Sequence, residues 1–344
     1  MENIKFLKTD DNTTGLYCEN TKDIFHSKSG ALTEAKEKFI LPIKSVLNDL
    51  SEIKVLDICF GIGYNSKALL SSYPNHNILI DALEYYDNYV LLSPFIFDGI
   101  NDFELRGFLL SQIQQNLNID FFQYKSILKS YINENIEFFD ESIAFFDKID
   151  DNSPYKNPKC PQNNRFLHNI YYEYISSRVI NNGKCSKYIN SRINFHIGDA
   201  RKNILNCNEM YDVVFLDAFS SQKDPTLWTI DFLGRVSNKI NPNGLLVTYS
   251  KSTPVRSALK QLGFFVGKTY INDIDMGTVA SFNIKNILNP LSEYDFELLK
   301  TRSGITYKDP TLSLSSLQIL KNREIEQNNS NLISHTQFLK KTKT

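Results

Sequence analysis

Apolar and polar residues follow one another in a pattern typical of a parallel β-sheet covered by helices. Short, nearly continuous apolar runs begin at Val55, Asn77, Arg192, Tyr211 and Gly244, and helix-like stretches lie between several of them. Several of these runs end in a glycine or a carboxylate. The alternation predicts an α/β fold in which each run is a buried strand.

The run from Val55 to Asn65 predicts a strand, a tight turn and the start of a helix over Ser66–Tyr73. Gly61 and Gly63 permit positive φ angles and a close approach of a ligand, and the first N–H groups of a helix attract negative charge. Ser66 replaces the third glycine of a dinucleotide fingerprint, so a diphosphate-binding loop is not favoured. The pattern indicates either a cofactor cradle or an ordinary strand-to-helix turn.

Carboxylates follow three of the predicted strands. Glu84 ends the second strand, about twenty residues beyond the glycine loop, which is the spacing of an acid that holds a ribose diol. Asp199 either caps a helix or accepts a hydrogen bond from an exocyclic amine such as purine N6. Asp217 ends the fourth strand, and we expect it beside the glycine loop because ligands lie beyond the carboxyl ends of parallel strands.

The last two predicted strands, Gly263–Ile271 and Gly277–Ile284, form a hairpin-like pair in which we expect Val266 and Val279 to face the same layer. Seven strands closed in this way favour a Rossmann-like class I methyltransferase sheet over a dehydrogenase half. A helix starting near Ser29 or Gly30 is expected to end at Pro42. The predicted parts are N-terminal strands and a lid helix over 1–50, the core over 51–87 and 191–285, a helical insertion over 88–190, a C-terminal extension over 286–327 and a flexible tail over 328–344.

The net charge of −1 excludes a uniformly basic nucleic-acid binder but not a basic face. Residues 232–272 carry six Lys or Arg and no acid, which indicates either a phosphate-facing edge or a solvated helix face. Five scattered cysteines without a C-x-x-C pair argue against a disulfide framework or a zinc site, so no metal is expected. No secretory or membrane-spanning segment is predicted, and the cytoplasm is the expected location. Trp228, the single tryptophan, is expected in the core.

Several motifs resemble the tRNA 5-methylaminomethyl-2-thiouridine methyltransferases, the MnmC-type family. Cys59–Asn65 is similar to the family's F-G-x-G-x-N loop, and Leu216–Ser220 with Asp224, Pro225 and Trp228 resembles its D-A-F-(S/A)-P…(N/D)-P-x-(L/M)-W motif. Similar segments of the family correspond to Asp23–Ser27 with Gly30 and Glu34, and to Gly304–Pro310. The resemblance spans about residues 20–310 without the insertion, and it departs from the family at Cys59 and at Ser221, where proline is usual.

The resemblance implies S-adenosyl-L-methionine as cofactor and methyl donor. It implies as acceptor the primary amine of 5-aminomethyluridine, or of its 2-thio form, at the wobble position of tRNA. Asp217 is the predicted catalytic residue. The predicted cofactor-binding residues are Phe60, Gly61, Gly63, Asn65, Glu84, Asp199, Ala200 and Glu34. The predicted substrate and tRNA contacts are Phe219, Arg235, Lys251, Arg256, Tyr307 and Lys308.

The resemblance also implies a stand-alone methyltransferase without the FAD-dependent oxidase half of bifunctional members, because Gly61 and Gly63 form the one G-x-G of the chain. A separate oxidase or upstream uridine-modifying enzymes would then supply the substrate. Two other functions remain open at this point. One is an aminopropyltransferase resembling spermidine synthase, and the other is a non-catalytic tRNA- or protein-binding module on the same scaffold.

Overall fold

The computed structural model describes residues 4–19, 22–25, 30–47, 50–100, 102–117, 124, 127–128, 130–131, 135–139 and 187–341. The chain forms two compact units. The first comprises residues 1–36 and 60–197, and the second comprises residues 37–59 and 198–344.

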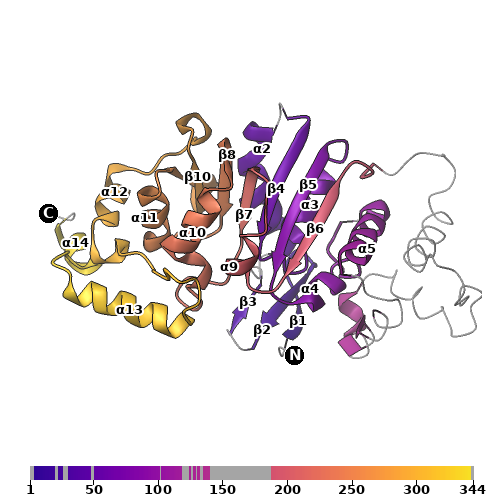
Figure 1. Ribbon diagram of the computed structural model, residues 1–344, viewed down its shortest axis with the longest axis horizontal. Coiled ribbons are helices and arrows are strands. Elements are labelled where there is room, and N and C mark those ends of the chain that lie inside the picture. The colour runs from indigo at the N-terminus through magenta and orange to yellow at the C-terminus, as the bar shows by residue number, and fades with distance from the viewer. Residues whose placement is uncertain are drawn as a thin grey trace, which may run out of the picture. The chain divides into compact units, whose positions relative to one another are not determined.

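The main sheet has seven strands in the order β6-β5-β4-β7-β8-β10-β9 (Figure 1). Its strands are β4 (Glu52–Ile58), β5 (Asn77–Glu84), β6 (Arg192–Ile197), β7 (Tyr211–Leu216), β8 (Ile240–Thr248), β9 (Phe265–Ile271) and β10 (Ile274–Ser281). β5 is parallel to β6, and β7 is parallel to β4 and β8, whereas β10 is antiparallel to both β8 and β9. The predicted seven-stranded α/β sheet is confirmed.

Along the chain, helices precede, separate and follow these strands. The α-helices whose bounds are described are α1 (Ala31–Glu34), α2 (Leu41–Leu47), α3 (Tyr64–Ser72), α4 (Asp87–Leu92), α5 (Phe103–Leu117), α9 (Ala200–Asn203), α10 (Ile230–Ser237), α11 (Thr253–Gln261), α12 (Glu293–Leu299), α13 (Ser316–Asn329) and α14 (His335–Lys341). Short 3-10 turns span Ile136–Phe138, Thr226–Trp228, Ile284–Asn286 and Arg302–Gly304.

Continuous apolar sequence buries the middle of the sheet. Every residue of β7 from Val213 to Leu216 is buried, as expected for a parallel strand covered on both faces. α2 packs over β7 and β8, and just before it the ring of Phe39 meets that of Phe215 edge-on with centroids 5.7 Å apart. The carboxyl end of β7 is therefore carried on a rigid strand.

The register of the closing pair corrects one expectation. Val266 pairs with Ala280, and Val279 pairs with Gly267. Because directly opposed residues of antiparallel strands point to the same face, Val266 and Val279 point to opposite faces. Both are nevertheless buried. The apolar pattern alone did not determine which residues of the two strands stand opposite one another.

The predicted helix begins as expected but does not end at Pro42. α1 starts directly after Gly30, the chain continues as a π-helix over Ala35–Ile40, and Pro42 is the second residue of α2. Proline is tolerated in the first turn of a helix, because its missing N–H removes no necessary hydrogen bond there. The proline thus marks a change of helix type rather than an end.

Asp11 ties the N-terminal strands to the start of α1. These strands, in a small antiparallel sheet, are β1 (Ile4–Lys8), β2 (Thr14–Cys18) and β3 (Asp23–Ile24). One carboxylate oxygen of Asp11 accepts hydrogen bonds from the hydroxyls of Thr9 and Thr13, and the other accepts from the backbone and hydroxyl of Thr33. Gly30 has a φ of 139°, and a Cβ there would lie 2.3 Å from this carboxylate, so glycine is required.

We expect Asp11→Asn to lower the unfolding temperature at neutral pH and to matter less in acid. Burial raises the pKa of Asp11, but hydrogen bonds from Thr13, Thr33 and Thr9 outweigh it and lower the pKa to about 2. The unfolded carboxyl has a pKa of about 3.9, so the stabilisation is complete above about pH 4 and is lost as the pH falls through about 2. Thermal unfolding across this range checks it, with Asp10→Asn in the same turn as control. A difference from the wild type that stays constant into this acid range would contradict it.

The first part of the predicted insertion over 88–190 lies against the sheet. α5 runs alongside β6 (Figure 1). The side-chain oxygen of Gln112 accepts a hydrogen bond from the backbone N–H of Ile193. The side-chain amide of Asn116 donates a hydrogen bond to the backbone carbonyl oxygen of Ile193. α5 therefore covers the sheet edge instead of belonging to a separate subdomain. Most of the remaining insertion lies outside the described residues.

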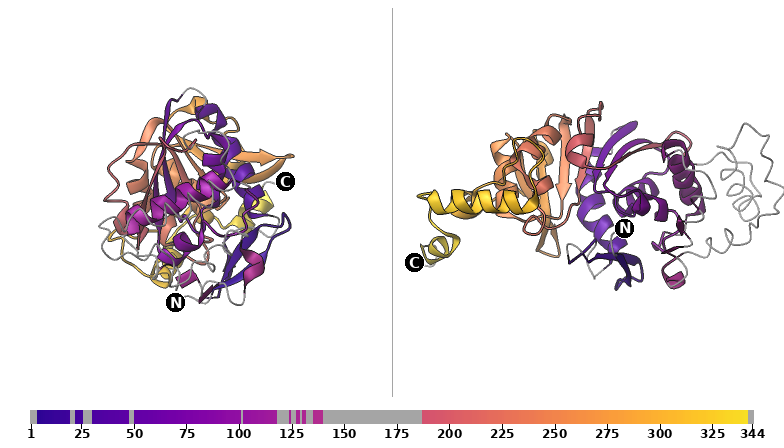
Figure 2. Two further views of the ribbon diagram at one scale, coloured as in Figure 1. Left: turned by 90° about the vertical axis from the view of Figure 1, so that its right-hand side faces the viewer. Right: turned by 60° about the horizontal axis from the view of Figure 1, so that its bottom comes forward.

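The C-terminal part of the second unit contains α12, α13 and α14, and α14 turns off at the end of α13 (Figure 2). The tail predicted over 328–344 is corrected within its described part. Phe338 of α14 is buried, and its ring lies 5.2 Å from that of Tyr294. One apolar residue in a polar stretch is too weak a pattern to predict this docking.

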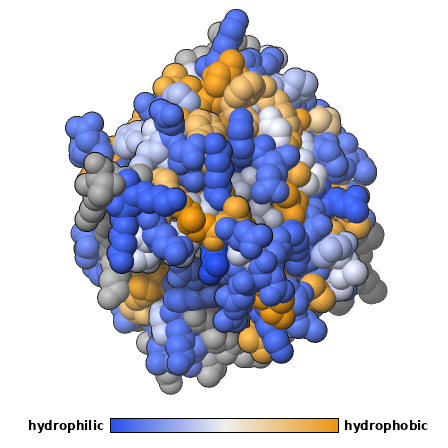
Figure 3. Space-filling model, turned by 90° about the vertical axis from the view of Figure 1, so that its left-hand side faces the viewer, coloured by the Kyte–Doolittle hydropathy of each residue, from blue (hydrophilic) through white to orange (hydrophobic). Residues whose placement is uncertain are grey.

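The face of the molecule in Figure 3 is mostly hydrophilic, with apolar side chains gathered near its top and in a smaller group near its middle. None of the helices within the described ranges combines the length and apolar character that crossing a bilayer requires.

Candidate active site

The glycine loop turns sharply ahead of α3. Gly61 and Gly63 have φ angles of 56° and 83°. A Cβ at Gly63 would lie 2.5 Å from the ring of Phe60, so this position requires glycine for packing as well as for its backbone angle. Within the described chain, a Cβ at Gly61 would meet only the ring of Phe25, at 3.5 Å. Gly61 therefore leaves the backbone open to a ligand.

Glu84 is held against this loop by backbone N–H groups. Its Oε2 accepts a hydrogen bond from Gly61 at 2.7 Å, and its Oε1 accepts from Tyr85 at 2.8 Å and Tyr86 at 3.1 Å. The residue is 6% exposed. Hydrogen bonds to an ionised carboxylate are short and strong, so they fix its orientation. The predicted ribose-binding acid and the glycine loop lie together, while the ribose contact itself stays a prediction.

A buried ion cluster that no motif indicated lies behind the loop. The ammonium of Lys67 lies 2.9 Å from Asp98 and 2.7 Å from the carbonyl oxygen of Ser93, and Arg106 lies 3.1 Å from Asp98. The hydroxyl of Ser93 in turn donates to the carbonyl oxygen of Ile62 in the loop. The sequence gives one signal for it, which is that Lys67 is the single charged residue of α3. The cluster braces the loop from behind.

Three more predicted cofactor residues belong to the same unit. Phe60 and Asn65 are buried at the loop and at the start of α3. The ring of Phe60 meets that of Phe195 in β6 edge-on, with centroids 5.2 Å apart. Glu34 is buried at the end of α1, which packs against α3. Their contacts with the cofactor stay predictions.

Asp217 stands half-buried directly after β7. The two residues that follow are held by large side chains. The hydroxyl of Tyr249 donates to the carbonyl oxygen of Ala218 at 2.7 Å, and the indole N–H of Trp228 donates to that of Phe219 at 2.8 Å. Trp228 is fully buried, as predicted. The loop after Asp217 is therefore fixed from the core.

Asp199 is the N-cap of α9, the simpler of its two predicted roles. Its carboxylate accepts from the backbone N–H of Arg201 at 2.9 Å and also pairs with the guanidinium of that residue. Burial raises the pKa of Asp199, but hydrogen bonds and charge from Arg201 outweigh it and lower the pKa below its usual value. Arg201 also reaches Asp309 at 3.0 Å. The contact of Asp199 and Ala200 with adenine stays a prediction.

The predicted basic residues differ in what they already bind. The guanidinium of Arg256 is buried and lies 3.0 Å from Asp275, and the ammonium of Lys308 lies 2.7 Å from Glu326. Arg256 is used within the fold, so we remove it from the predicted RNA contacts, whereas the ion pair of Lys308 is exposed and its RNA contact stays a prediction. Arg235 is exposed on α10 and stays a prediction.

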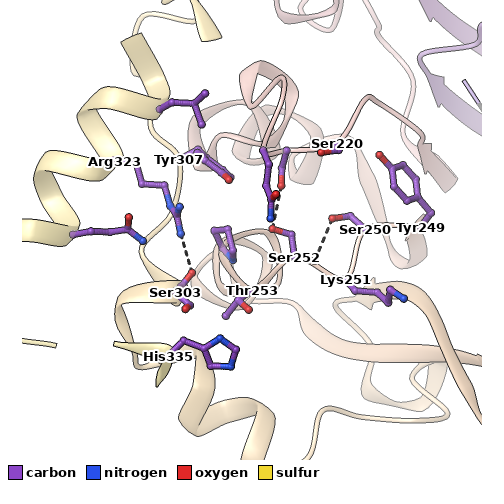
Figure 4. A pocket seen from close by; sticks show the side chains of 15 residues that line it. Ser220, Tyr249, Ser250, Lys251, Ser252, Thr253, Ser303, Tyr307, Arg323 and His335 are labelled. Carbon is purple, nitrogen blue, oxygen red and sulfur yellow. Dashed lines mark hydrogen bonds between the residues drawn. The ribbon is translucent and has the colours of Figure 1, made fainter. Parts of the chain in front are cut away.

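A cavity of about 710 Å³ lies in the second unit, beyond the ends of β7 and β8 (Figure 4). It is lined by Ser220, Ser221, Gln222, Tyr249, Ser250, Lys251, Ser252, Thr253, Pro254, Ser303, Tyr307, Leu320, Arg323, Gln327 and His335. Of the predicted RNA contacts, Lys251 and Tyr307 line it. The lining, which belongs to the described part of the chain, includes no Asp or Glu. Arg323 and His335 also line the cavity, and neither belongs to a motif that the sequence indicated.

The strand order and the glycine loop place the chain among the class I S-adenosyl-L-methionine-dependent methyltransferases. Its relatives specify the family further. The chain belongs to the family of S-adenosyl-L-methionine-dependent methyltransferases that includes the uncharacterized protein MJ0670 of Methanocaldococcus jannaschii. The two are 31% identical over 320 residues, which are 92% of this chain and 71% of that protein. A family model described as S-adenosyl-L-methionine-dependent methyltransferase matches residues 161–271.

Two further relatives carry the MnmC name. The tRNA 5-methylaminomethyl-2-thiouridine biosynthesis bifunctional protein MnmC of Campylobacter hominis is 22% identical over 254 residues, which are 74% of this chain but 29% of that protein. The chain thus spans less than a third of that relative. The crystal structure of MNMC2 from Aquifex aeolicus superposes with a TM-score of 0.61 at 23% identity, covering 95% of this chain and 86% of that one. This likeness shows a shared fold.

The residues of the first unit fit S-adenosyl-L-methionine, the cofactor of this family. Gly61 offers an approachable backbone, and Glu84 presents a fixed carboxylate of the kind that binds a ribose diol. That these two residues and the rest of the loop hold the cofactor stays a prediction.

Proposed function

We propose that the protein methylates the primary amine of 5-aminomethyluridine, or of its 2-thio form, at the wobble position of tRNA. The observation that carries the proposal is the fixed loop after Asp217. It borders a cavity whose described lining has hydroxyls, aromatic rings and cations and no acid. Such a lining suits a nucleotide. The similarity to proteins named for 5-methylaminomethyl-2-thiouridine biosynthesis supports the same substrate.

The chemistry requires an amine with a free lone pair. An alkylamine has a pKa of about 10.4 and is mostly protonated at neutral pH. Bound S-adenosyl-L-methionine would supply an electrophilic methyl carbon whose leaving group is a thioether sulfur. Asp217 would bind the ammonium, orient the nitrogen and take up its proton, so that the nitrogen lone pair forms the new N–C bond as the S–C bond breaks.

The lining, which has no acid among the residues that the structure describes, argues against an aminopropyltransferase. A polyamine substrate carries several positive charges and would gain from carboxylates along its binding site. This cavity instead presents Lys251, Arg323 and His335. If the protein is instead a non-catalytic binding module, no acceptor will be methylated.

The test is a methyl-transfer assay with S-adenosyl-L-methionine and tRNA that carries 5-aminomethyl-2-thiouridine, followed by mass analysis of the nucleosides. We expect one methyl group on the side-chain nitrogen of the wobble uridine. The matched control is the same tRNA with an unmodified wobble uridine, and a further arm contains putrescine with the decarboxylated cofactor. Equal methylation of both tRNAs, or transfer to putrescine alone, would refute the proposal.

A further inference from the structure

The C-terminal extension forms one wall of the cavity. Ser303 and Tyr307 precede α13, Arg323 lies on α13, and His335 begins α14. In Figure 4 these side chains stand across the cavity from Tyr249 at the end of β8. The extension therefore completes the cavity that borders the loop after Asp217.

Arg323 is a half-buried cation in this wall. Its Nε donates to the carbonyl oxygen of Ile305 at 2.6 Å, one Nη donates to that of Ser303 at 3.0 Å, and its guanidinium lies over the Tyr307 ring at 4.7 Å from the centroid. Burial lowers the pKa of Arg323 below its usual value, although the charges of Tyr307 and Glu326 act in the opposite direction. Within the described residues no carboxylate forms a salt bridge with Arg323, and Glu326 is already paired with a lysine. A partly desolvated cation of this kind is stabilised by an anionic ligand.

The amino end of α11 forms another part of the lining. Ser252, Thr253 and Pro254 line the cavity there, and the hydroxyl of Ser252, the N-cap residue, makes no capping bond to the helix. The first N–H groups of a helix carry a partial positive charge. This helix end adds to the charge that Arg323 supplies. In Figure 4, Lys251 lies across the cavity from Arg323. Its ammonium donates to the backbone carbonyl oxygen of Asp275.

We propose that the cavity binds a phosphate group of an RNA chain, with Arg323 as the residue that pairs with it. The C-terminal extension is then part of the RNA-binding surface. The proposal rests on the proposed function for RNA as the source of the phosphate. Arginine presents a planar set of donors that matches a phosphate, and the neighbouring serine and threonine hydroxyls offer further hydrogen bonds.

The experiment measures binding of an anticodon stem–loop RNA by fluorescence anisotropy over a series of salt concentrations, without methyl transfer. We expect Arg323→Gln to weaken binding about tenfold and to reduce the slope of log affinity against log salt by about 0.7, the value for one lost contact to a single strand. Arg323→Lys, which keeps the charge, should recover most of the slope. Lys321→Gln, on the same helix and outside the lining, is the matched control and should bind as the wild type does.

Unchanged affinity and salt slope in Arg323→Gln would overturn the proposal. If that variant does not fold, a competition experiment on the wild-type protein tests the proposal. Inorganic phosphate should displace the bound RNA more strongly than chloride does at equal ionic strength. Equal displacement by the two salts would overturn it. Phosphate that binds without displacing the RNA would point to a free phosphate compound and would also overturn it. Absence of methylation with Arg323-dependent RNA binding would refute only the proposed function, whereas normal methylation with Arg323-independent binding would refute only this inference.

Discussion

Asp217→Asn is expected to lower kcat for the proposed methylation of 5-aminomethyluridine in tRNA by about 10²-fold or more, the usual range for the loss of a group that moves a proton. The amide has nearly the same shape as the carboxylate, but it neither binds an ammonium by charge nor accepts its proton. Since the loop is fixed by Tyr249 and Trp228, the substitution should leave the fold intact. Single-turnover methyl transfer measured together with thermal unfolding checks both parts.

The matched control is Asp212→Asn, at the opposite end of β7, where the carboxylate accepts a hydrogen bond from the backbone N–H of Lys54. We expect this control to affect stability and to leave kcat nearly unchanged. Near-normal turnover by Asp217→Asn would show that another group orients the amine. An equal loss of kcat in the two variants would show that the effect is structural.

Glu84→Gln is expected to weaken binding of S-adenosyl-L-methionine by about tenfold to a hundredfold, because hydrogen bonds to a charged group contribute about 1.5–3 kcal/mol. The amide retains one acceptor oxygen but loses the charge that holds the N–H of Gly61 and that, by our prediction, holds a ribose diol. Calorimetric titration with the cofactor measures the effect without the need for an RNA substrate.

Asp81→Asn provides the control for this substitution. Asp81 is a buried carboxylate on the same strand, and it is paired with His196 at 2.7 Å instead of with the glycine loop. Its replacement should leave cofactor affinity within a small factor of the wild type. If Glu84→Gln binds the cofactor as tightly as the wild type, the ribose assignment is wrong.

The sheet was predictable because its strands are continuous apolar runs that end in recognisable groups. Val213–Leu216 is apolar at every position, and such a run is buried on both faces whatever its neighbours. The register of β9 and β10 was not predictable, since Val266 and Val279 are apolar on both possible alignments. The passage of the helix through Pro42 was missed because the π-helical segment before it has no signature in the sequence.

The site was predictable where a short motif carries its own geometry. Gly61 and Glu84 are separated by a characteristic distance along the chain, and the structure joins them by one hydrogen bond. Residues brought together only by tertiary folding were missed. Arg323 reaches the cavity from a helix far along the chain, and neither the helix nor its neighbours have a pattern that indicates this. Conversely, the positive charge of Arg256 suggested an RNA contact, but Asp275 compensates it inside the fold.

One carboxylate joins the chain just before α5 to the chain just before β6. Asp102, just before α5, accepts a hydrogen bond from the hydroxyl of Tyr188 at 2.7 Å and lies 2.6 Å from the ammonium of Lys187. The segment between these anchor points therefore begins and ends at one fixed junction. Because each doubling of a loop costs only about 0.6 kcal/mol of closure entropy, we expect a change in chain length between the end of α5 and Lys187 to leave the glycine loop undisturbed.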